Sequence, residues 1–414
     1  MSSEYDVGPG ARGRDGGHAV IAPSALRILL IGSANSVHVR RWARDLTAIG
    51  HLVEIATWQP GPACDAAAIH VAPAPSIWWP LRTALALRWL GSLSRRLRPD
   101  VIHVHSIGVY GLLMLTLPRG PLVVVTPWGS EVRASRHSPV RARVTRTALN
   151  RADLVLPTSD EVAHEATDRY GVPAQQVRIL SWGVPDDLLD SGARNDHHAM
   201  RERFGIPAGA VVVLCIRSAS RTYRTLEVIS AFTEAAAGRP ELFLVVLVGH
   251  RPDRPSARLA QEGYLDLVRQ RAARLSGRVR VIDQVLSQRE IFDLMTVSAI
   301  AVSVPSGDQR SSSVLEAAAA GCRLLLADIP PYREMVAGDL VADLLAEPVT
   351  DHLAAALKTA EPPDPETRRR NLELVSRAER GSYKVAELVT IYRELISGSR
   401  SRPAGHYSGR NPRF

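Results

Sequence analysis

The sequence predicts an α/β protein made of two doubly wound parallel-sheet domains that face each other across a cleft. Short, continuous apolar runs alternate with helical segments over residues 26–159, and the same alternation restarts after the polar stretch 191–203. The chain has 414 residues, of which 45% are hydrophobic, and this is enough for two separate cores.

The first half begins with the apolar run 26–32 (LRILLIG), which ends in a glycine, and continues with helical periodicity over 38–51. Further strands are predicted at 52–58, 99–105, 121–130 (a strand that runs into a loop) and 151–159, with a helix over 80–98. Strands that are apolar along their whole length are buried on both faces, which predicts a parallel sheet covered by helices.

The second half repeats this architecture without repeating the sequence. Strands are predicted at 210–218, 242–250, 279–283, 298–306 and 322–328, and helices at 224–237, 256–276, 287–297 and 313–320. Residues 370–398 are expected to form one long final helix or a pair of helices. Sheets of this kind bind ligands at the carboxyl ends of their strands, so two of them predict a site in the cleft between the domains.

We therefore expect five parts along the chain. They are a disordered N-terminus (1–24), a first domain (25–190), a second domain (191–372), a helix that packs back toward the first domain (373–398) and a flexible basic tail (399–414). The hinge is expected within 181–200. Residues 1–24 lack the apolar core of a signal peptide, and no run approaches the roughly 20 apolar residues of a spanning helix. These features predict a cytoplasmic protein.

The charge is basic, with a formal net charge of +9 and a pI of about 9.9, and arginine supplies nearly all of it. Such an excess suits nucleic acid, a membrane surface or phosphorylated small molecules. We interpret the arginines as spread along the chain, which predicts no nucleic-acid partner. Three distant cysteines, Cys64, Cys215 and Cys322, fit neither a metal site nor a disulfide framework, and indicate a reducing compartment.

The stretch 304–316 (VPSGDQRSSSVLE) carries the clearest chemistry. Backbone N–H groups at a helix start bind anions, and the serines at 311–313 are small enough to let a phosphate approach. Glu316 can accept two hydrogen bonds from a ribose diol, and Asp308 can reach beyond the phosphates to an attached group. The stretch fits a nucleotide diphosphate carrying a sugar. It also fits an ordinary capped helix with a solvated glutamate and a turn-forming aspartate.

In the order of its motifs the chain resembles the retaining glycosyltransferases of family GT4 (group 1), which have the GT-B fold. The family has an acid, seven residues, then a glutamate at a helix start, followed by small residues and a glycine. Asp308 and Glu316 stand at these positions in GDQRSSSVLEAAAAG. The motifs PDVIHVH, TPWGSEV, ADLVLPTS, RILSWGV and REIFDLM also occur in family order. The resemblance covers roughly residues 26–395.

The resemblance implies roles for residues of the second domain. Glu316 would hold the donor ribose, Asp308 would hold sugar hydroxyls near the reaction centre, and backbone amides near Ser312 and Ser313 would meet the diphosphate. Arg217 matches an arginine that grips the diphosphate and would act in catalysis.

A second basic residue of the family, a lysine five positions after that arginine, is missing, because Thr222 stands there. A branch of the family lacks this lysine and has a tyrosine six positions after the arginine, and Tyr223 fits that pattern. Arg221 or Arg224 is then expected to supply the second charge, since a guanidinium can serve as well as an ammonium against two phosphates.

The first domain is expected to form the acceptor side. The loop 32–42 follows the first strand, where Gly32 allows a tight turn and is assigned to the donor-binding set. Asn35 and His38 are expected to face the acceptor, although His38 suits a capping or packing role equally well. The loop lacks the GxGxxG pattern, which argues against a dinucleotide cofactor.

Two further first-domain residues are candidates. His105 ends the strand VIHVH and is taken as the catalytic histidine that the family often carries in this neighbourhood, although His103 alternates to the same face. Glu131, after TPWGS, would orient an acceptor hydroxyl or cap the next helix.

The implied reaction is retaining, metal-independent glycosyl transfer without a cofactor, from a nucleotide-diphosphate sugar to a hydroxyl of a small-molecule, glycan or lipid-linked acceptor. A nucleotide-sugar 2-epimerase of the same fold and a non-catalytic sugar-nucleotide binder are the alternatives. The stretch 76–99 mixes tryptophans with arginines. It fits either a helix packed on the sheet or a basic amphipathic helix at the inner membrane surface.

Overall fold

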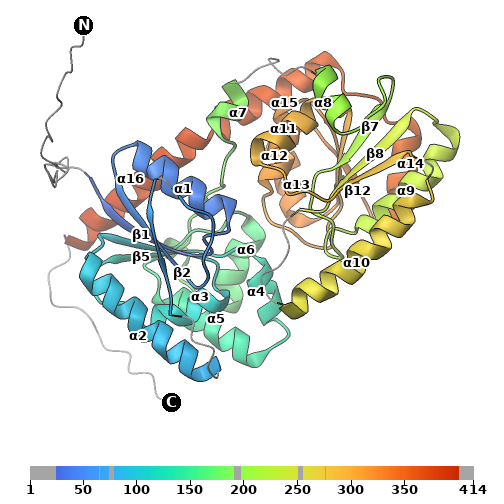
Figure 1. Cartoon of the computed structure of the whole chain (residues 1–414). Coiled ribbons are helices and arrows are strands. Elements are labelled where there is room, and N and C mark those ends of the chain that lie inside the picture. The colour runs from blue at the N-terminus through green and yellow to red at the C-terminus, as the bar shows by residue number, and fades with distance from the viewer. Residues whose placement is uncertain are drawn as a thin grey trace, which may run out of the picture.

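The computed structural model describes residues 25–64, 66–73, 79–190, 197–249, 255–275 and 277–400. It contains two six-stranded sheets, ordered β3-β2-β1-β4-β5-β6 and β12-β11-β10-β7-β8-β9, and all of their strand pairs are parallel. Figure 1 shows the two sheets as separate bodies, each flanked by helices. The predicted fold class of two doubly wound α/β domains is confirmed.

The first domain contains six strands and the helices between them. In chain order its elements are β1 Arg27–Ile31, α1 Val37–Ala48, β2 Leu52–Thr57, β3 Ala68–Val71, α2 Trp79–Leu97, β4 Val101–His105, α3 Gly108–Leu113, η1 Met114–Thr116, β5 Leu122–Thr126, α4 Ser130–Ser135, α5 Pro139–Arg151, β6 Leu154–Val155, α6 Asp160–His164, η2 Glu165–Arg169 and η3 Ala174–Gln176. Two short helices, α7 Asp186–Asp190 and α8 His197–Arg203, lie on the way to the second sheet.

The second domain repeats the strand order of the first. Its elements are β7 Val211–Cys215, α9 Thr225–Gly238, β8 Leu242–Leu247, α10 Pro255–Ala273, β9 Val279–Ile282, α11 Gln288–Thr296, β10 Ile300–Ser303, α12 Ser312–Ala319, β11 Arg323–Ala327, α13 Pro330–Ala337, β12 Asp343–Leu345, α14 Val349–Thr359 and α15 Pro365–Ala378. The chain ends in α16 Gly381–Arg400, which reaches back toward the first domain (Figure 1).

Local sequence explains where several helices start. Ser36 accepts a hydrogen bond from the backbone N–H of Val39 at 3.4 Å and caps α1. Ser287 and Glu290 form a complete capping box at the start of α11. Ser138 caps α5, and a proline follows it at the first helical position, where the missing N–H costs nothing.

Each sheet has a switch point, where consecutive connections leave in opposite directions. In the first sheet it lies between β1 and β4, and in the second between β7 and β10. The predicted residues Gly32 and His105 lie at the ends of β1 and β4, and Arg217 and Asp308 lie just after β7 and β10. The switch points are where doubly wound sheets open a crevice for ligands.

The chain crosses between the domains twice, and the two crossings lie side by side. Val184 pairs with Arg380 in a parallel bridge. The N–H of Val184 donates to the carbonyl of Glu379 at 2.6 Å, and the N–H of Gly381 donates to the carbonyl of Val184 at 2.7 Å. Gly183 has φ +68°, and a Cβ there would lie 2.8 Å from the Glu379 carbonyl, so the crossing requires glycine.

The final helical region is a pair of helices, and the break between them lies later than expected. Residues 373–378 belong to α15, whose Val375 is buried in the core of the second domain. Helix α16 packs on the first domain, where Leu388 and Tyr392 join the core formed by β1 and α1. It runs to Arg400, two residues beyond its expected end at 398. The predictions for residues 1–24 and for the tail from 401 onward lie outside the described residues.

Several elements were not predicted. The strands β3 and β12 are short edge strands, and the helices α3, α4 and α5 divide a stretch that the sequence left without helices. The short edge strands lack the continuous apolar runs on which the other strands were recognised. Among the described helices, none combines the length and the apolar character needed to cross a bilayer.

Candidate active site

A pocket of about 290 Å³ opens between the domains at the switch point of the second sheet. The first domain contributes Val37 and His38 to its wall. The remaining lining comes from the second domain: Ile216, Arg217, Ser218, Tyr223, Leu247, Gly249, Gln284, Val285, Leu286, Gln288, Ile291, Ser312, Ser313 and Glu316. Six residues singled out in the sequence therefore meet at one pocket: His38, Arg217, Tyr223, Ser312, Ser313 and Glu316.

Arg217 is the cation of this pocket. Its guanidinium donates to Ser311 Oγ at 2.7 Å and to the Tyr223 hydroxyl at 2.5 Å, and it lies 4.4 Å from the centre of the Tyr223 ring. It also lies 3.3 Å from the carboxylate of Asp308. The pKa of Arg217 is raised, because Asp308 and Tyr223 outweigh the opposing effect of burial. Because Ser311, Tyr223 and Asp308 fix the guanidinium of Arg217, this cation can bind an anion in the pocket without moving.

Asp308 lies behind Arg217, and its carboxylate is held from two sides. Besides the contact with Arg217, it accepts a hydrogen bond from the Tyr332 hydroxyl at 2.9 Å. Tyr332 is completely buried, and its hydroxyl also lies 2.8 Å from Ser303 Oγ. Burial and the neighbouring Asp308 raise the pKa of Tyr332 well above its ordinary value, so it stays a neutral donor.

Glu316 lies in the second turn of α12 and is 4% exposed. Its carboxylate accepts a hydrogen bond from Gln288 Nε2 at 2.7 Å. Burial raises the pKa of Glu316 to about 7, against the lowering effects of Gln288, Arg41 and Arg217. A carboxyl group that titrates near neutrality in a pocket wall has the character of a binding or catalytic group.

The serines prepare the start of α12 for an anion. Ser311 occupies the N-cap position but caps no backbone N–H, and its hydroxyl accepts from Arg217 instead. Ser312 and Ser313 line the pocket, and the buried Ser312 hydroxyl has no partner within the described part of the chain. The first backbone N–H groups of the helix are therefore left without side-chain caps.

Arg221 and Arg224, expected to replace the missing lysine, do not line the pocket. Arg221 lies over the ring of Tyr264, 5.3 Å from its centre. Arg224 forms an ion pair with Glu347 at 2.5 Å and has the left-handed backbone conformation, with φ +50°, just before α9. Arg217 is the one arginine among the described lining residues.

Aromatic rings pack behind His38 on the first-domain side and form what we call the aromatic wall, of which His38 alone lines the pocket. The ring of His38 stacks on Trp182 with 4.6 Å between centroids, and Trp128 meets both of these rings edge-on. His105 is buried behind the wall, 5.6 Å from Trp182. Burial lowers the pKa values of His38 and His105 to about 3, so both imidazoles are neutral at pH 7.

The structure distinguishes the roles of the two histidines of β4, which the sequence alone did not distinguish. The two ring nitrogens of His103 lie 2.6 Å from the Tyr392 hydroxyl and 2.8 Å from Thr126 Oγ1. Both ring nitrogens of His105 are buried and have no partner among the described residues. His103 is therefore a structural link between β4, β5 and α16, while His105 keeps its hydrogen-bonding capacity unused.

The remaining first-domain candidates lie beside this wall. Glu131 accepts hydrogen bonds from the N–H groups of Ile107 and Trp128, at 3.1 and 2.7 Å, and so joins the loops after β4 and β5. Glu131 lies in the first turn of α4 and makes no cap of that helix, so its role in the structure differs from the helix cap considered for it. Asn35 is half-buried in the turn before α1, and a Cβ on Gly32 would lie 3.1 Å from the Cβ of His105.

Contacts across the cleft hold the loop that carries Asp308. Arg133 of α4 donates to the Asp308 carbonyl at 3.0 Å, and Thr158 Oγ1 donates to Gln309 at 2.8 Å. Arg310 donates twice to the buried carboxylate of Glu379, at 3.1 and 2.6 Å. Glu379 also accepts from Ser181, so one acid ties the loop to both interdomain crossings.

Sequence reasoning missed Tyr332, Gln288, Trp182, Arg133 and Glu379. Trp182 lies within the motif RILSWGV and Gln288 directly precedes REIFDLM, but neither motif shows that Trp182 meets His38 or that Gln288 meets Glu316. These contacts join residues far apart in the chain, up to 198 positions for Ser181 and Glu379.

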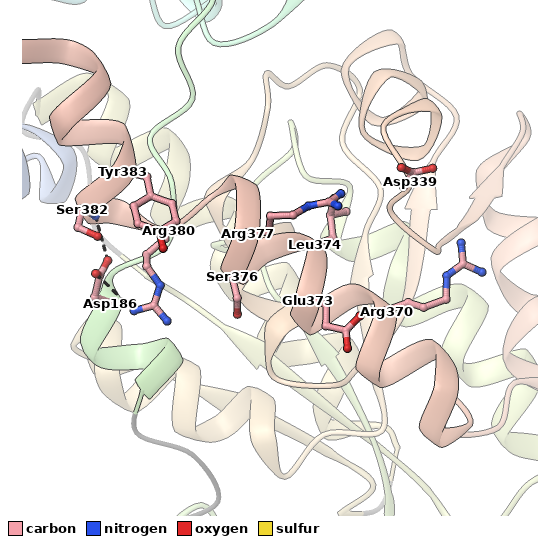
Figure 2. Close-up of a pocket in the computed structure, with 10 residues that line it drawn as sticks. All are labelled: Asp186, Asp339, Arg370, Glu373, Leu374, Ser376, Arg377, Arg380, Ser382 and Tyr383. Carbon is pink, nitrogen blue, oxygen red and sulfur yellow. Dashed lines mark hydrogen bonds and ion pairs between the residues drawn. The ribbon is translucent and has the colours of Figure 1, made fainter. Parts of the chain in front are cut away.

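A larger hollow of about 960 Å³ lies elsewhere, where α15 meets α16. Figure 2 shows its wall, in which Arg380 and the backbone of Ser382 bind Asp186 beside the hinge. None of the residues predicted for the site lines it. Across the described segments, no group of three or more His, Cys, Asp and Glu residues is arranged to hold a metal ion.

The chain is similar in sequence to known glycosyltransferases. Residues 36–188 match the family model described as Glycosyltransferase Family 4. A curated relative, the alpha-D-kanosaminyltransferase of Streptomyces kanamyceticus, is 24% identical over 341 residues, which cover 75% of this chain and 82% of that protein.

Solved structures share the fold over nearly the whole chain. A sucrose-phosphate synthase from Thermosynechococcus elongatus matches with a TM-score of 0.73 and 18% identity, covering 90% of this chain and 99% of that one. HepE from Anabaena, solved with UDP-glucose, matches with a TM-score of 0.68 and 16% identity, covering 91% and 99%. Residues 36–188 are thus similar to glycosyltransferases of family 4, the similarity to the curated glycosyltransferase extends over three quarters of the chain, and the solved structures share its two-domain fold.

Proposed function

We propose that the protein transfers a sugar from a nucleotide-diphosphate donor to a hydroxyl group, with retention at the anomeric carbon and without a metal ion. The observation that carries the proposal is the convergence of Arg217, the uncapped start of α12 and Glu316 on one pocket. These groups match the diphosphate and the ribose of one ligand. HepE, which shares the fold, was solved with UDP-glucose, and this supports a nucleotide-sugar donor.

In the proposed complex the diphosphate lies against the N–H groups of α12 and the Arg217 guanidinium. The bond from the anomeric carbon to the β-phosphate oxygen breaks, and negative charge grows on that phosphate. A fixed cation and helix amides stabilise this charge without reorganising. The arginine and Tyr223 fit the lysine-lacking pattern, with one guanidinium in place of a pair of cations.

Asp308 would accept hydrogen bonds from sugar hydroxyls while Tyr332 and Arg217 fix its carboxylate. Two neutral histidines border the sugar side in this proposal. The departing β-phosphate oxygen can take the proton of the acceptor hydroxyl, so the new bond forms on the face that the phosphate leaves. The name of the curated relative specifies an α-D-glycosyl group, which supports a retaining outcome from an α-linked donor.

The acceptor would enter along the first domain, past the wall of His38, Trp128 and Trp182. Buried indoles usually find a hydrogen-bond partner, and the indole nitrogens of Trp128 and Trp182 have none among the described residues. An acceptor rich in hydroxyl groups would supply such partners. The acceptor classes remain a small molecule, a glycan or a lipid-linked sugar.

Slow donor hydrolysis tests the proposal without a known acceptor. The full chain is incubated in EDTA with UDP-glucose, dTDP-glucose, ADP-glucose or GDP-mannose, and the first released sugar is followed by proton NMR before it mutarotates. We expect one donor to release the α-anomer in EDTA. A β-anomer would overturn retention, and activity restored only by added divalent metal would overturn metal independence.

The variant Asp308→Asn separates the enzyme from a non-catalytic binder. We expect it to bind the nucleotide product but to release no sugar. Hydrolysis at the wild-type rate in this variant would exclude the assigned role of Asp308, and sugar released with an inverted C2 centre would support the epimerase alternative.

A further inference from the structure

The positive charge of the chain is concentrated in one segment of the first domain. Residues 79–151 contain twelve arginines, no lysine and two acids, a formal charge of +10 against +9 for the whole chain. The rest of the chain is therefore close to neutral. The arginines themselves occur along the whole sequence, as expected, and this segment is distinctive because only two of the chain's 42 acids lie in it.

The fold brings this segment to one side of the molecule. Helix α2, the short helix η1 and helix α5 cover the same face of the first sheet, since Leu90, Met114 and Leu149 belong to one core cluster with strands β1, β4 and β5. Helix α3 and η1 each contact both α2 and α5. Figure 1 shows α2, α3 and α5 on this side of the first sheet. The outward sides of these elements form one continuous surface, which we call the arginine face.

Most charges of the arginine face have no structural partner. Arg88, Arg95 and Arg96 lie on α2, Arg119 lies in the loop between η1 and β5, and Arg141 and Arg143 lie on α5. All six are exposed, and none has a hydrogen bond or ion pair to a described residue. The two acids of the segment are occupied, because Asp100 accepts from the N–H of Arg27 and Glu131 joins two loops. Six like charges on neighbouring elements, without carboxylates to pair them, favour an external anion.

Apolar side chains are exposed among these charges. Leu81 and Leu85 on α2 are 51% and 36% exposed, Leu115 on η1 is 58% exposed, and Val140 at the start of α5 is 73% exposed. A nucleic-acid backbone offers nothing to these side chains. The boundary between the headgroups and acyl chains of a bilayer accommodates both kinds of group, because arginines meet lipid phosphates while leucines enter the apolar region.

We propose that the arginine face docks the protein on the surface of an anionic phospholipid bilayer. Each basic side chain near such a surface contributes about a fivefold gain in partitioning at low ionic strength. Six unpaired arginines with four exposed apolar side chains are enough for reversible peripheral binding. The proposal is independent of the proposed function, because none of these ten residues lines the candidate active site.

Vesicle co-sedimentation of the full chain tests the proposal. Wild-type protein is compared on vesicles of phosphatidylcholine alone and on vesicles with about 30% phosphatidylglycerol, at low and high salt. The test variant is Arg88→Glu/Arg95→Glu/Arg141→Glu. Its matched control, Arg258→Glu/Arg271→Glu/Arg274→Glu, makes the same charge change at exposed positions on and just after α10 in the second domain.

We expect the wild type and the control to bind the anionic vesicles at low salt, and the face variant to bind about 100-fold more weakly. Equal losses in both triple variants would mean that net charge alone acts, and would overturn the assignment of this face. Failure of the wild type to sediment with anionic vesicles would overturn the proposal directly.

A second variant distinguishes a bilayer from a nucleic acid. Leu81→Asn/Leu85→Asn keeps every charge, and we expect it to fold normally because both leucines are exposed. We expect this variant to lose about tenfold in binding to anionic vesicles. Undiminished vesicle binding, together with tight binding of the wild type to duplex DNA, would identify the surface as a nucleic-acid site instead.

Discussion

The two walls of the candidate active site are built differently. On the second-domain side, the charged and hydroxyl groups bind each other: Arg217 meets Asp308, Ser311 and Tyr223, and Glu316 meets Gln288. On the first-domain side, aromatic rings stack while both nitrogens of His105 and the Trp182 indole nitrogen stay unpaired within the described part of the chain.

The difference fits the two substrates of the proposed glycosyl transfer. A diphosphate and a ribose have fixed chemistry, and a pre-arranged set of charges and hydroxyls can be complementary to them. An acceptor varies from enzyme to enzyme, and an aromatic wall with spare hydrogen-bonding capacity can be adapted to it. Substitutions on the two sides should therefore separate donor binding and turnover from acceptor use.

The largest effect is expected for Asp308→Asn. Turnover should fall by about 10²–10³-fold, because the variant removes a fixed charge beside the sugar that is proposed to react. Nucleotide affinity should change little, since Arg217 and α12 remain. Steady-state kinetics and calorimetry measure the two quantities on one preparation. Equal losses in turnover and nucleotide binding would show that Asp308 acts only by holding Arg217.

Glu316→Gln should weaken nucleotide binding and stabilise the fold at the same time. Burial raises the pKa of Glu316 to about 7 in the folded protein, against an ordinary value of 4.5, so the ionised form destabilises the ligand-free protein above pH 7. Ionisation of Glu316 lowers the free energy of unfolding by about 3 kcal/mol. This loss disappears below pH 4.5, where Glu316 is protonated in both the folded and the unfolded protein. Chemical denaturation at pH 8 and at pH 4.5 should show the gain at the higher pH only.

The same titration predicts a pH dependence of donor binding. If the ribose hydroxyls donate to the Glu316 carboxylate, binding favours the ionised form, and nucleotide affinity should rise as the pH increases from 6 to 8. Calorimetry in two buffers of different ionisation enthalpy should detect the released proton. An affinity that is independent of pH in the wild type would contradict the contact with the ribose.

The two histidines of β4 offer a matched pair. His103→Leu leaves the buried Tyr392 and Thr126 hydroxyls unpaired and should cost about 2–4 kcal/mol of unfolding free energy. His105→Leu removes no hydrogen bond to a described residue and should cost less than about 1 kcal/mol. If His105 borders the reacting sugar, His105→Leu should still lose turnover while its nucleotide affinity is retained. A stable variant with full turnover would make His105 a packing residue.

The smallest expected effect is at the hinge. Glu379→Gln removes the charge that binds Arg310 and should reduce turnover about tenfold by loosening the loop of Asp308. Arg380→Gln is the control, because its ion pairs with Asp186 and Asp190 lie at the same junction but do not contact the loop. Equal losses in the two variants would show that general weakening of the hinge explains the effect.

Much of the donor side could be predicted from the sequence, because its chemistry is local. Asp308, Ser312 and Glu316 lie within one short stretch at a strand-to-helix turn, and Arg217 directly follows an apolar strand. The partners that hold them could not be predicted, since Tyr332 reaches Asp308 from another helix. The failure of Arg221 and Arg224 to reach the pocket follows from Tyr264 and Glu347, which are remote in sequence.

The acceptor side was less predictable for a related reason. The period of two in a strand places His103 and His105 on one face, and only Tyr392, 289 positions from His103, distinguishes them. Glu131 could orient a substrate or join two loops, and the choice depends on where the backbone of Ile107 lies. The roles of these residues depend on contacts with parts of the chain that are distant in sequence, and a local sequence pattern carries no information about those contacts.

The donor site is tested by calorimetric titration of the full chain with UDP, GDP, dTDP and ADP in EDTA, repeated with Arg217→Ala and Glu316→Ala. We expect one nucleotide to bind with a Kd on the order of micromolar, and both variants to lose this binding by about 100-fold or more. Binding that survives in both variants, or no binding of any nucleotide to the wild type, would contradict the donor site described above.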